Sequence, residues 1–157
     1  GNVESLVTEL EKQCPNCTLL VVTGRNDLLF KRLNKRPAAS SHTRIYQFVD
    51  NMEVLMTACD IVVTKAGPGT IMEAATLGKF IVLTGAVGLQ EEGNIDFVID
   101  SHWGVYCQTP MKIGQTVADI AAKRGHCPAI SPATAPPYAG TRRIAQTLYS
   151  MLQQGGR

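Results

Sequence analysis

The sequence predicts an α/β domain of the doubly wound class, in which helices cover both faces of a parallel sheet. Short apolar runs such as residues 18–23 have the length and β-branched content of strands that are buried on both faces. Segments such as residues 3–13 lie between them, and their apolar positions recur with the 3.6-residue period of a half-buried helix. Strands and helices that alternate through short links form parallel sheets.

The same two patterns continue along the chain. Pro15 and Asn16 end the first helix, and residues 125–140 form a proline-rich stretch with no assigned element. A final amphipathic helix carries Ile144, Leu148, Met151 and Leu152. Strands are predicted over residues 18–23, 44–48, 60–64, 80–84 and 104–107, and helices over residues 3–13, 27–35, 51–59, 71–77, 94–101 and 111–123.

Residues 1–157 are expected to form one domain, because the sequence shows no internal repeat and no composition shift. The predicted order begins with a helix, whereas doubly wound domains usually open with a strand. The chain is therefore expected to start one element late. Ligands of this fold class bind at the carboxyl ends of the strands.

Composition indicates a globular domain and excludes several kinds of partner. The chain has 157 residues, of which 45% are hydrophobic and 18% are charged, a balance that allows a packed core. Its net charge is only +2 and its basic residues are scattered, so no nucleic-acid partner is expected. No apolar run approaches the roughly 20 residues of a membrane span, and the first residues do not resemble a signal peptide.

The cysteines and histidines predict neither redox chemistry nor a metal site. Five cysteines without a framework of regular spacings favour a reducing compartment. Cys14 and Cys17 form a C-x-x-C pair, but the pair ends a predicted helix, whereas a redox motif opens one. His42, His102 and His126 are far apart in the sequence, so no zinc ligand set is evident. We expect free thiols, no metal and no cofactor.

Residues 64–70, Thr-Lys-Ala-Gly-Pro-Gly-Thr, form the most informative stretch. They leave a buried strand and enter a helix through Gly67 and Gly69, where the lack of Cβ atoms allows backbone to approach a ligand. The free N–H groups and positive dipole end of a new helix bind anions, and a diphosphate is the obvious candidate. A tight structural connection remains the alternative, since the stretch is neither a Walker loop nor G-x-G-x-x-G.

Thr70 and Glu73 allow two interpretations. Their spacing fits a capping box, in which the two side chains satisfy the first N–H groups of the helix, and spacing alone favours this interpretation. In the other, the Glu73 carboxylate accepts hydrogen bonds from the two ribose hydroxyls of a nucleotide.

Residues 85–94 form a second glycine-containing polar loop between a strand and a helix. Gln90 and Glu91 have side chains that suit a sugar, whose hydroxyls both donate and accept hydrogen bonds. A solvated loop with a helix cap is the simpler interpretation of this stretch.

Both loops, together with residues 48–60 and the Gly24-Arg25-Asn26 turn, resemble the C-terminal, donor-binding domain of the monogalactosyldiacylglycerol synthases. That family lies within the inverting GT-B glycosyltransferases, which include the bacterial enzyme that adds N-acetylglucosamine to lipid I. The resemblance runs from residue 3 to about residue 110 and fades beyond residue 125.

The resemblance implies a role for each matching residue. The backbone near Phe48 and Val49 would meet the uracil edge, and Glu73 would bind the ribose hydroxyls. Asn94 belongs to the same motif, with a role that could be structural. The diphosphate would be held by Gly67, Pro68, Gly69 and Thr70, and the sugar would be contacted by Gln90 and Glu91.

The resemblance also implies a function. The chain would be the UDP-sugar-binding, Rossmann-like half of a GT-B hexosyltransferase, lacking its first strand and the N-terminal acceptor domain. The full enzyme would transfer a hexose, with galactose favoured, from UDP to a membrane lipid such as diacylglycerol, with inversion and without a metal. The catalytic residues would lie on the acceptor domain, so the chain alone would bind donor without turnover.

The expected location is intracellular, with peripheral membrane association of the full protein, at the plastid envelope if the resemblance holds. Two alternatives stay open. One is a standalone donor-binding subunit of a split UDP-N-acetylglucosamine transferase. The other is a non-catalytic nucleotide-binding module.

Overall fold

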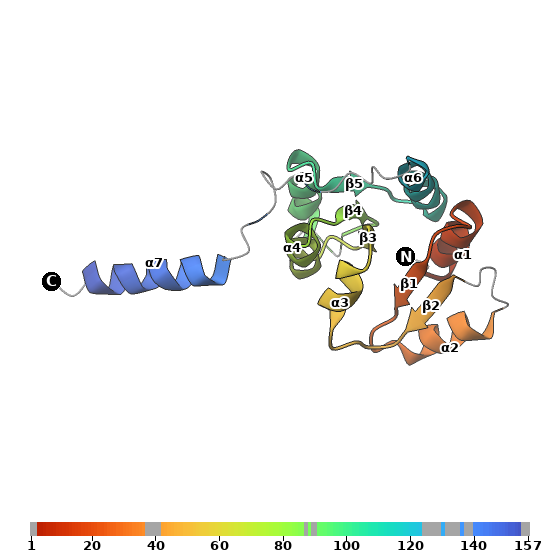
Figure 1. The fold of residues 1–157 in the computed structure, drawn as a ribbon, viewed down its shortest axis with the longest axis horizontal. Helices are drawn as coiled ribbons and strands as arrows, with labels where there is room; N and C mark the ends of the chain where they lie inside the picture. Colours follow the sequence, from red (N-terminus) through yellow and green to blue (C-terminus); the bar gives the residue numbers. More distant parts are fainter. Residues whose placement is uncertain are drawn as a thin grey trace.

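The computed structural model describes residues 3–36, 42–86, 88, 91–123, 130, 136 and 140–154. Helices and strands alternate in the predicted order (Figure 1). The helices are α1 (Val3–Gln13), α2 (Asp27–Lys35), α3 (Met52–Thr57), α4 (Pro68–Thr76), α5 (Glu92–Asp100), α6 (Pro110–Ala122) and α7 (Gly140–Gln154), and the strands are β1 (Leu19–Val22), β2 (Thr43–Tyr46), β3 (Ile61–Thr64), β4 (Phe80–Leu83) and β5 (Gly104–Tyr106).

All the strand pairs among the described residues are parallel, as the alternating pattern predicts. The strands form two sheets, one in the order β1-β2 and the other in the order β3-β4-β5. In the described part of the chain, β1 and β3 are not hydrogen-bonded to each other, so the sheet is divided at this point (Figure 1).

The side chains of β4 show that helices cover both faces of the larger sheet. All four residues of β4 are buried. Ile81 and Leu83 pack into a cluster with side chains of α3, α4 and α5. Phe80 and Val82 face the opposite way, into a cluster with side chains of α1 and α6. This alternation follows from the two-residue period of a strand and confirms the predicted fold class.

Helices α1 and α6 pack closely although they lie far apart in the sequence. The Gln13 Nε2 donates to the Met111 carbonyl over 3.2 Å, and the Cys14 thiol lies 3.7 Å from the Gly114 carbonyl. A Cβ at Gly114 would lie 2.9 Å from Gln13 Nε2 and 3.2 Å from the Glu9 carbonyl oxygen. Glycine at position 114 therefore allows the two helices to approach.

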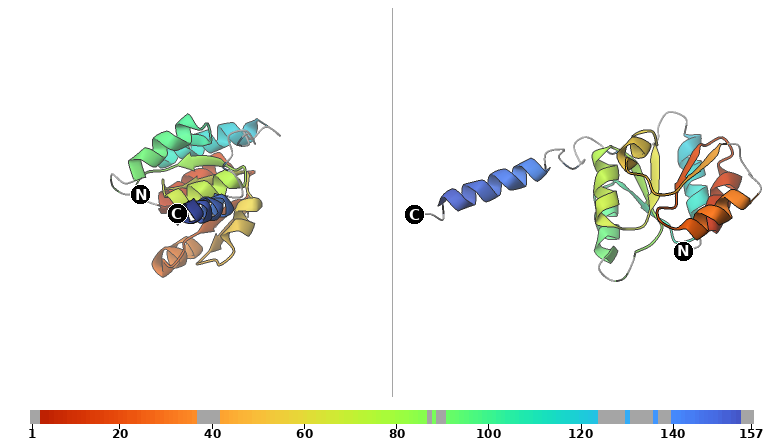
Figure 2. Two further views of the ribbon diagram at one scale, coloured as in Figure 1. Left: turned by 90° about the vertical axis from the view of Figure 1, so that its left-hand side faces the viewer. Right: turned by 90° about the horizontal axis from the view of Figure 1, so that it is seen from below.

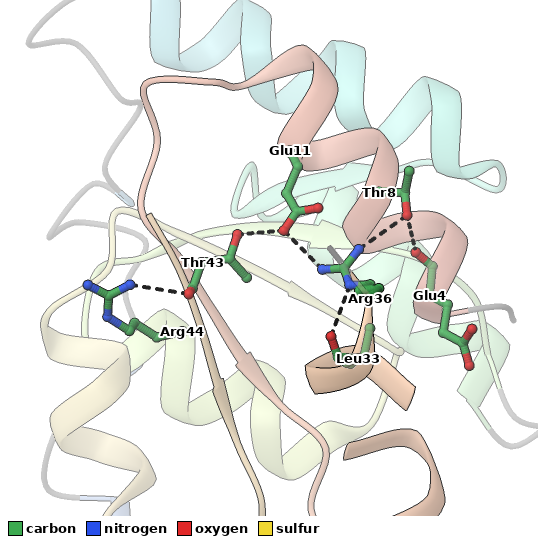
Figure 3. Close-up of polar contacts among 7 residues, drawn as sticks. All are labelled: Glu4, Thr8, Glu11, Leu33, Arg36, Thr43 and Arg44. Atoms are coloured by element: carbon green, nitrogen blue, oxygen red, sulfur yellow. Dashed lines mark hydrogen bonds and ion pairs between the residues drawn. The ribbon is translucent and has the colours of Figure 1, made fainter. Parts of the chain in front are cut away.

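A buried ion pair joins α1 to the smaller sheet (Figure 3). The Glu11 Oε1 lies 2.9 Å from Arg36 Nη2, just after α2, and accepts a hydrogen bond of 2.7 Å from the Thr43 hydroxyl of β2. The Glu11 side chain is 1% exposed, and its Oε2 has no hydrogen-bond partner. A carboxylate this deeply buried depends on its paired charge.

Helix α7 confirms the final predicted helix and stands apart from the two sheets in Figure 1 and in the right-hand view of Figure 2. Ile144, Leu148 and Met151 are exposed along it. The proline-rich stretch of residues 125–140 lies outside the described residues, apart from positions 130, 136 and 140.

Candidate functional site

The loops that follow β3 and β4 lie side by side at the carboxyl ends of the larger sheet. The Thr84 N–H donates to the Thr64 carbonyl over 2.9 Å, which continues the ladder between the strands. The Ala66 N–H then donates to the Gly85 carbonyl over 2.8 Å. The two polar loops of the sequence are therefore fixed to each other where ligands of this fold class bind.

Helix α4 begins earlier than the sequence predicts, with Gly67 as N-cap and Pro68 in the first turn. Proline suits this position because its missing N–H would have no partner there. No side chain caps this end, and the Ile71 N–H closes the first turn on the Gly67 carbonyl over 3.1 Å. The N–H groups of Gly69 and Thr70 thus lie at the positive end of the helix, where anions bind.

The start of α4 rules out the capping box between Thr70 and Glu73. Thr70 lies inside the first turn rather than at the N-cap, so its side chain cannot play the capping role. That interpretation, which spacing alone favours, is wrong. Proline at position 68 was the signal for the earlier start.

Glu73 is exposed on α4 and lines an open pocket of about 300 Å³ between α3 and α4. Glu53 lines the same pocket from α3, together with Met72, Thr76 and Leu77. Because the Glu73 carboxylate is not engaged in a cap, it is available to a ligand on this side of the helix.

Glu91 and Asn94 come from the second loop and the first turn of α5. The Glu91 Oε1 lies 3.8 Å from the position that a Cβ would take on Gly67, so this carboxylate stands beside the start of α4. The Asn94 Nδ2 donates to the carbonyl of the buried Ala66 over 2.8 Å. Asn94 therefore holds the turn before α4 in place. Gln90 lies outside the described residues.

Phe48 and Val49 lie in the turn between β2 and α3, at the carboxyl end of the smaller sheet. Phe48 is 55% exposed, and the guanidinium carbon of Arg25 lies 5.1 Å from its ring centroid, a cation–π geometry. The sequence singles out Arg25 only as part of the turn after β1. The adjacency of β1 and β2 is what brings it to Phe48.

The cysteine pair has no features of a redox site. Cys14 and Cys17 are both free, and the Cys17 N–H donates to the Cys14 carbonyl in the turn that ends α1. Burial, with a smaller effect of Cys17, raises the pKa of the Cys14 thiol to about 11, whereas a reactive thiol has a lowered pKa. Among the described residues, no group of histidine, cysteine and carboxylate side chains is placed to hold a metal ion.

The sequence matches the glycosyltransferase family 28 C-terminal domain over residues 2–92, which is more than half of the chain. The chain belongs to this family. The match contains the whole of the first polar loop and residues 85–92 of the second.

Two plant proteins illustrate the similarity of this chain to monogalactosyldiacylglycerol synthases. The chain is 42% identical over 104 residues to a probable monogalactosyldiacylglycerol synthase, chloroplastic, of Nicotiana tabacum. The aligned region covers 64% of this chain and 18% of the relative. The chain is 38% identical over 105 residues to monogalactosyldiacylglycerol synthase 1, chloroplastic, of Arabidopsis thaliana, covering 64% of this chain and 19% of the relative. The chain thus spans about a fifth of the length of these relatives.

A solved structure confirms the fold of this family 28 domain. The glycotransferase of kitacinnamycin superposes with a TM-score of 0.59 and 18% sequence identity, covering 90% of this chain and 34% of that structure.

None of the helices in the described ranges is both long and apolar enough to cross a bilayer.

Proposed function

We propose that this family 28 domain binds a UDP-sugar and serves a glycosyltransferase that moves a hexose to a lipid. The observation that carries the proposal is the uncapped start of α4, which the Ala66 and Asn94 hydrogen bonds hold beside the second loop. Backbone N–H groups and the helix dipole suit a diphosphate at this point. Galactose and diacylglycerol are the favoured sugar and acceptor, because the relatives are named monogalactosyldiacylglycerol synthases.

The proposed binding mode follows the order of the elements around the pocket. The base would lie near Phe48 and Val49, which precede α3, and the ribose near Glu73, which lines the pocket between α3 and α4. The diphosphate would lie at the α4 turn. The sugar would then reach Glu91, which stands beside Gly67, and Gln90.

The proposed chemistry assigns charge stabilisation to this domain. When the lipid hydroxyl attacks the sugar with inversion, the bond to the diphosphate breaks and UDP leaves with the developing negative charge. The Gly69 and Thr70 N–H groups would stabilise that charge without a metal. We propose that the acceptor site and the catalytic base lie outside this domain in the whole enzyme. We also propose that the enzyme acts at the plastid envelope, which agrees with the word chloroplastic in the relatives' names.

Calorimetric titration tests the proposal. We expect UDP and UDP-galactose to bind in the presence of EDTA, and ADP to bind at least tenfold more weakly. UDP-glucose and UDP-N-acetylglucosamine in the same series would rank the sugars. Equal affinity for ADP and UDP, or binding that EDTA abolishes, would contradict the proposal.

A Glu73→Ala variant tests the ribose contact. Loss of a charged hydrogen-bond acceptor should weaken UDP binding by about 1–3 kcal/mol, roughly 5- to 150-fold. Thermal stability should not change, because Glu73 closes no capping box. The matched control is Asp119→Asn, which removes one negative charge from an exposed position on α6, in the opposite helix layer. Equal affinities for the two variants would remove Glu73 from the site.

A further inference from the structure

Helix α7 exposes an apolar stripe to solvent. Ile144, Leu148 and Met151 recur at the spacing of one helix face, and they are 63%, 56% and 64% exposed. Each of the helices α1 to α6 buries at least one residue, whereas none of the described side chains of α7 is buried. An isolated helix of 15 residues is marginally stable in water, so α7 gains stability from a surface that covers this stripe.

The charges of the chain indicate which kind of surface this is. All thirteen acidic residues lie at or before Asp119, whereas five of the fifteen lysines and arginines come after it. Each of α1 to α6 contains an aspartate or a glutamate, but α7 contains none and has Arg142 and Arg143 in its first turn. Positive charge at the amino end of a helix opposes the helix dipole, so these arginines do not stabilise the helix itself. Their charge favours contact with an anionic surface.

The polar side chains of α7 form hydrogen bonds within the helix. The Thr147 hydroxyl donates to the Arg143 carbonyl over 3.0 Å, and the Gln153 Nε2 donates to the Tyr149 hydroxyl over 2.9 Å. Tyr149 is also exposed, and an aromatic ring with a polar end is typical of the boundary between water and lipid. A surface that offers apolar contact and negative charge fits this helix, and an anionic bilayer offers both.

We propose that α7 binds the surface of an anionic lipid bilayer. Ile144, Leu148 and Met151 would insert between the upper acyl chains, while the arginines would lie near the headgroup phosphates. No helix in the described part of the chain is long and apolar enough to cross a bilayer, so α7 would lie in the plane of the interface. The contact is separate from the nucleotide site, which lies at the carboxyl ends of the strands.

Sedimentation of residues 1–157 with lipid vesicles tests this binding. We expect the chain to bind vesicles of phosphatidylcholine that contain about one third phosphatidylserine, and to bind pure phosphatidylcholine about tenfold more weakly. Added salt should weaken the binding to the anionic vesicles. UDP should leave vesicle binding unchanged, so failure of the nucleotide site and failure of the lipid contact can be distinguished.

Two alanine variants separate the apolar stripe from the rest of the helix. Leu148→Ala should weaken binding to the anionic vesicles by about fivefold or more, because it removes apolar surface from the stripe. The matched control is Gln146→Ala, which lies on the opposite face and should change the affinity by less than about twofold. Alanine favours the helix at both positions, so the loss does not come from unfolding of α7.

An Arg143→Gln variant tests the contribution of charge. It should weaken binding to the anionic vesicles by about threefold or more and leave binding to pure phosphatidylcholine unchanged. Equal loss on both kinds of vesicle would contradict the contact with anionic headgroups.

Hydrogen exchange shows whether α7 itself meets the lipid. Without vesicles, the amides of α7 should exchange fast, and with anionic vesicles they should slow by about tenfold or more. The amides of the buried strand β4 should not change, which provides an internal reference.

Three results would overturn the proposal. One is the absence of binding to the anionic vesicles. Another is an equal loss of binding for Leu148→Ala and Gln146→Ala. The last is slow exchange of the α7 amides without lipid, which would identify the domain itself as the covering surface, or a second copy if the protection rises with the concentration of the chain.

Discussion

Replacing Asn94 by alanine tests whether α5 holds the turn that opens α4. The substitution removes the 2.8 Å hydrogen bond from Nδ2 to the Ala66 carbonyl. Ala66 is 0% exposed, so water does not readily replace the lost donor. A buried acceptor left without a partner costs about 1–3 kcal/mol. For a chain of this size, about 2 kcal/mol lowers the melting temperature by roughly 4–8 °C.

The assay is thermal unfolding followed by circular dichroism, with Asn51→Ala as the matched control. Asn51 is the N-cap of α3, is exposed and makes no side-chain capping hydrogen bond, so its replacement should change stability by less than about 0.5 kcal/mol. Asn94→Asp keeps the shape but places an acceptor opposite the carbonyl, and it should be destabilising too. Equal melting temperatures for the Asn94→Ala and Asn51→Ala variants would refute the positioning role of Asn94.

Three other changes have definite expected outcomes. Gly69→Ala should keep or raise the melting temperature, since the added Cβ meets nothing within 4 Å and alanine favours the helix. It should nevertheless weaken UDP binding more than tenfold in calorimetry, because the Cβ keeps the diphosphate away from the backbone. Arg36→Ala should lower the free energy of unfolding, measured in urea, by on the order of 3 kcal/mol, because the buried Glu11 carboxylate loses its paired charge. Arg32→Ala breaks an exposed ion pair and should cost under about 0.5 kcal/mol. Similar losses for the two variants would contradict the buried ion pair's larger contribution. Burial raises the pKa of Cys14 in the folded state from 9.0 to about 11, so the free energy of unfolding should fall as the pH rises from 9 to 11. If a Cys14→Ala variant, unfolded in urea, shows the same fall of stability with pH, Cys14 is excluded as its cause.

The sequence predicts the elements well because their signals are local. Apolar runs of strand length and the 3.6-residue period are properties of neighbouring residues, and the structure has each expected helix and strand. The sequence predicts that α4 starts at Ile71, which is later than its observed start at Pro68, a residue type that favours the first helical turn.

Contacts between elements could not be predicted in the same way. The Asn94 side chain reaches a carbonyl 28 residues away, and the position of Arg25 over Phe48 depends on which strands pair. Asn94 matches a motif, but only the structure shows that its amide fixes a turn. The division of the sheet likewise depends on strand order, which no local pattern contains.

The packing of α1 against α6 has a consequence for how the chain folds. The Cys14 thiol and the Gly114 carbonyl are 100 residues apart in the sequence, whereas the segment from β3 to β5 pairs strands that follow one another directly. Closing a long loop costs more entropy than closing a short one, so the β3–β5 segment should collapse early and the two helices should meet late. Unfolding should then begin with the separation of α1 from α6, so the contacts between these two helices should set the rate at which the domain unfolds.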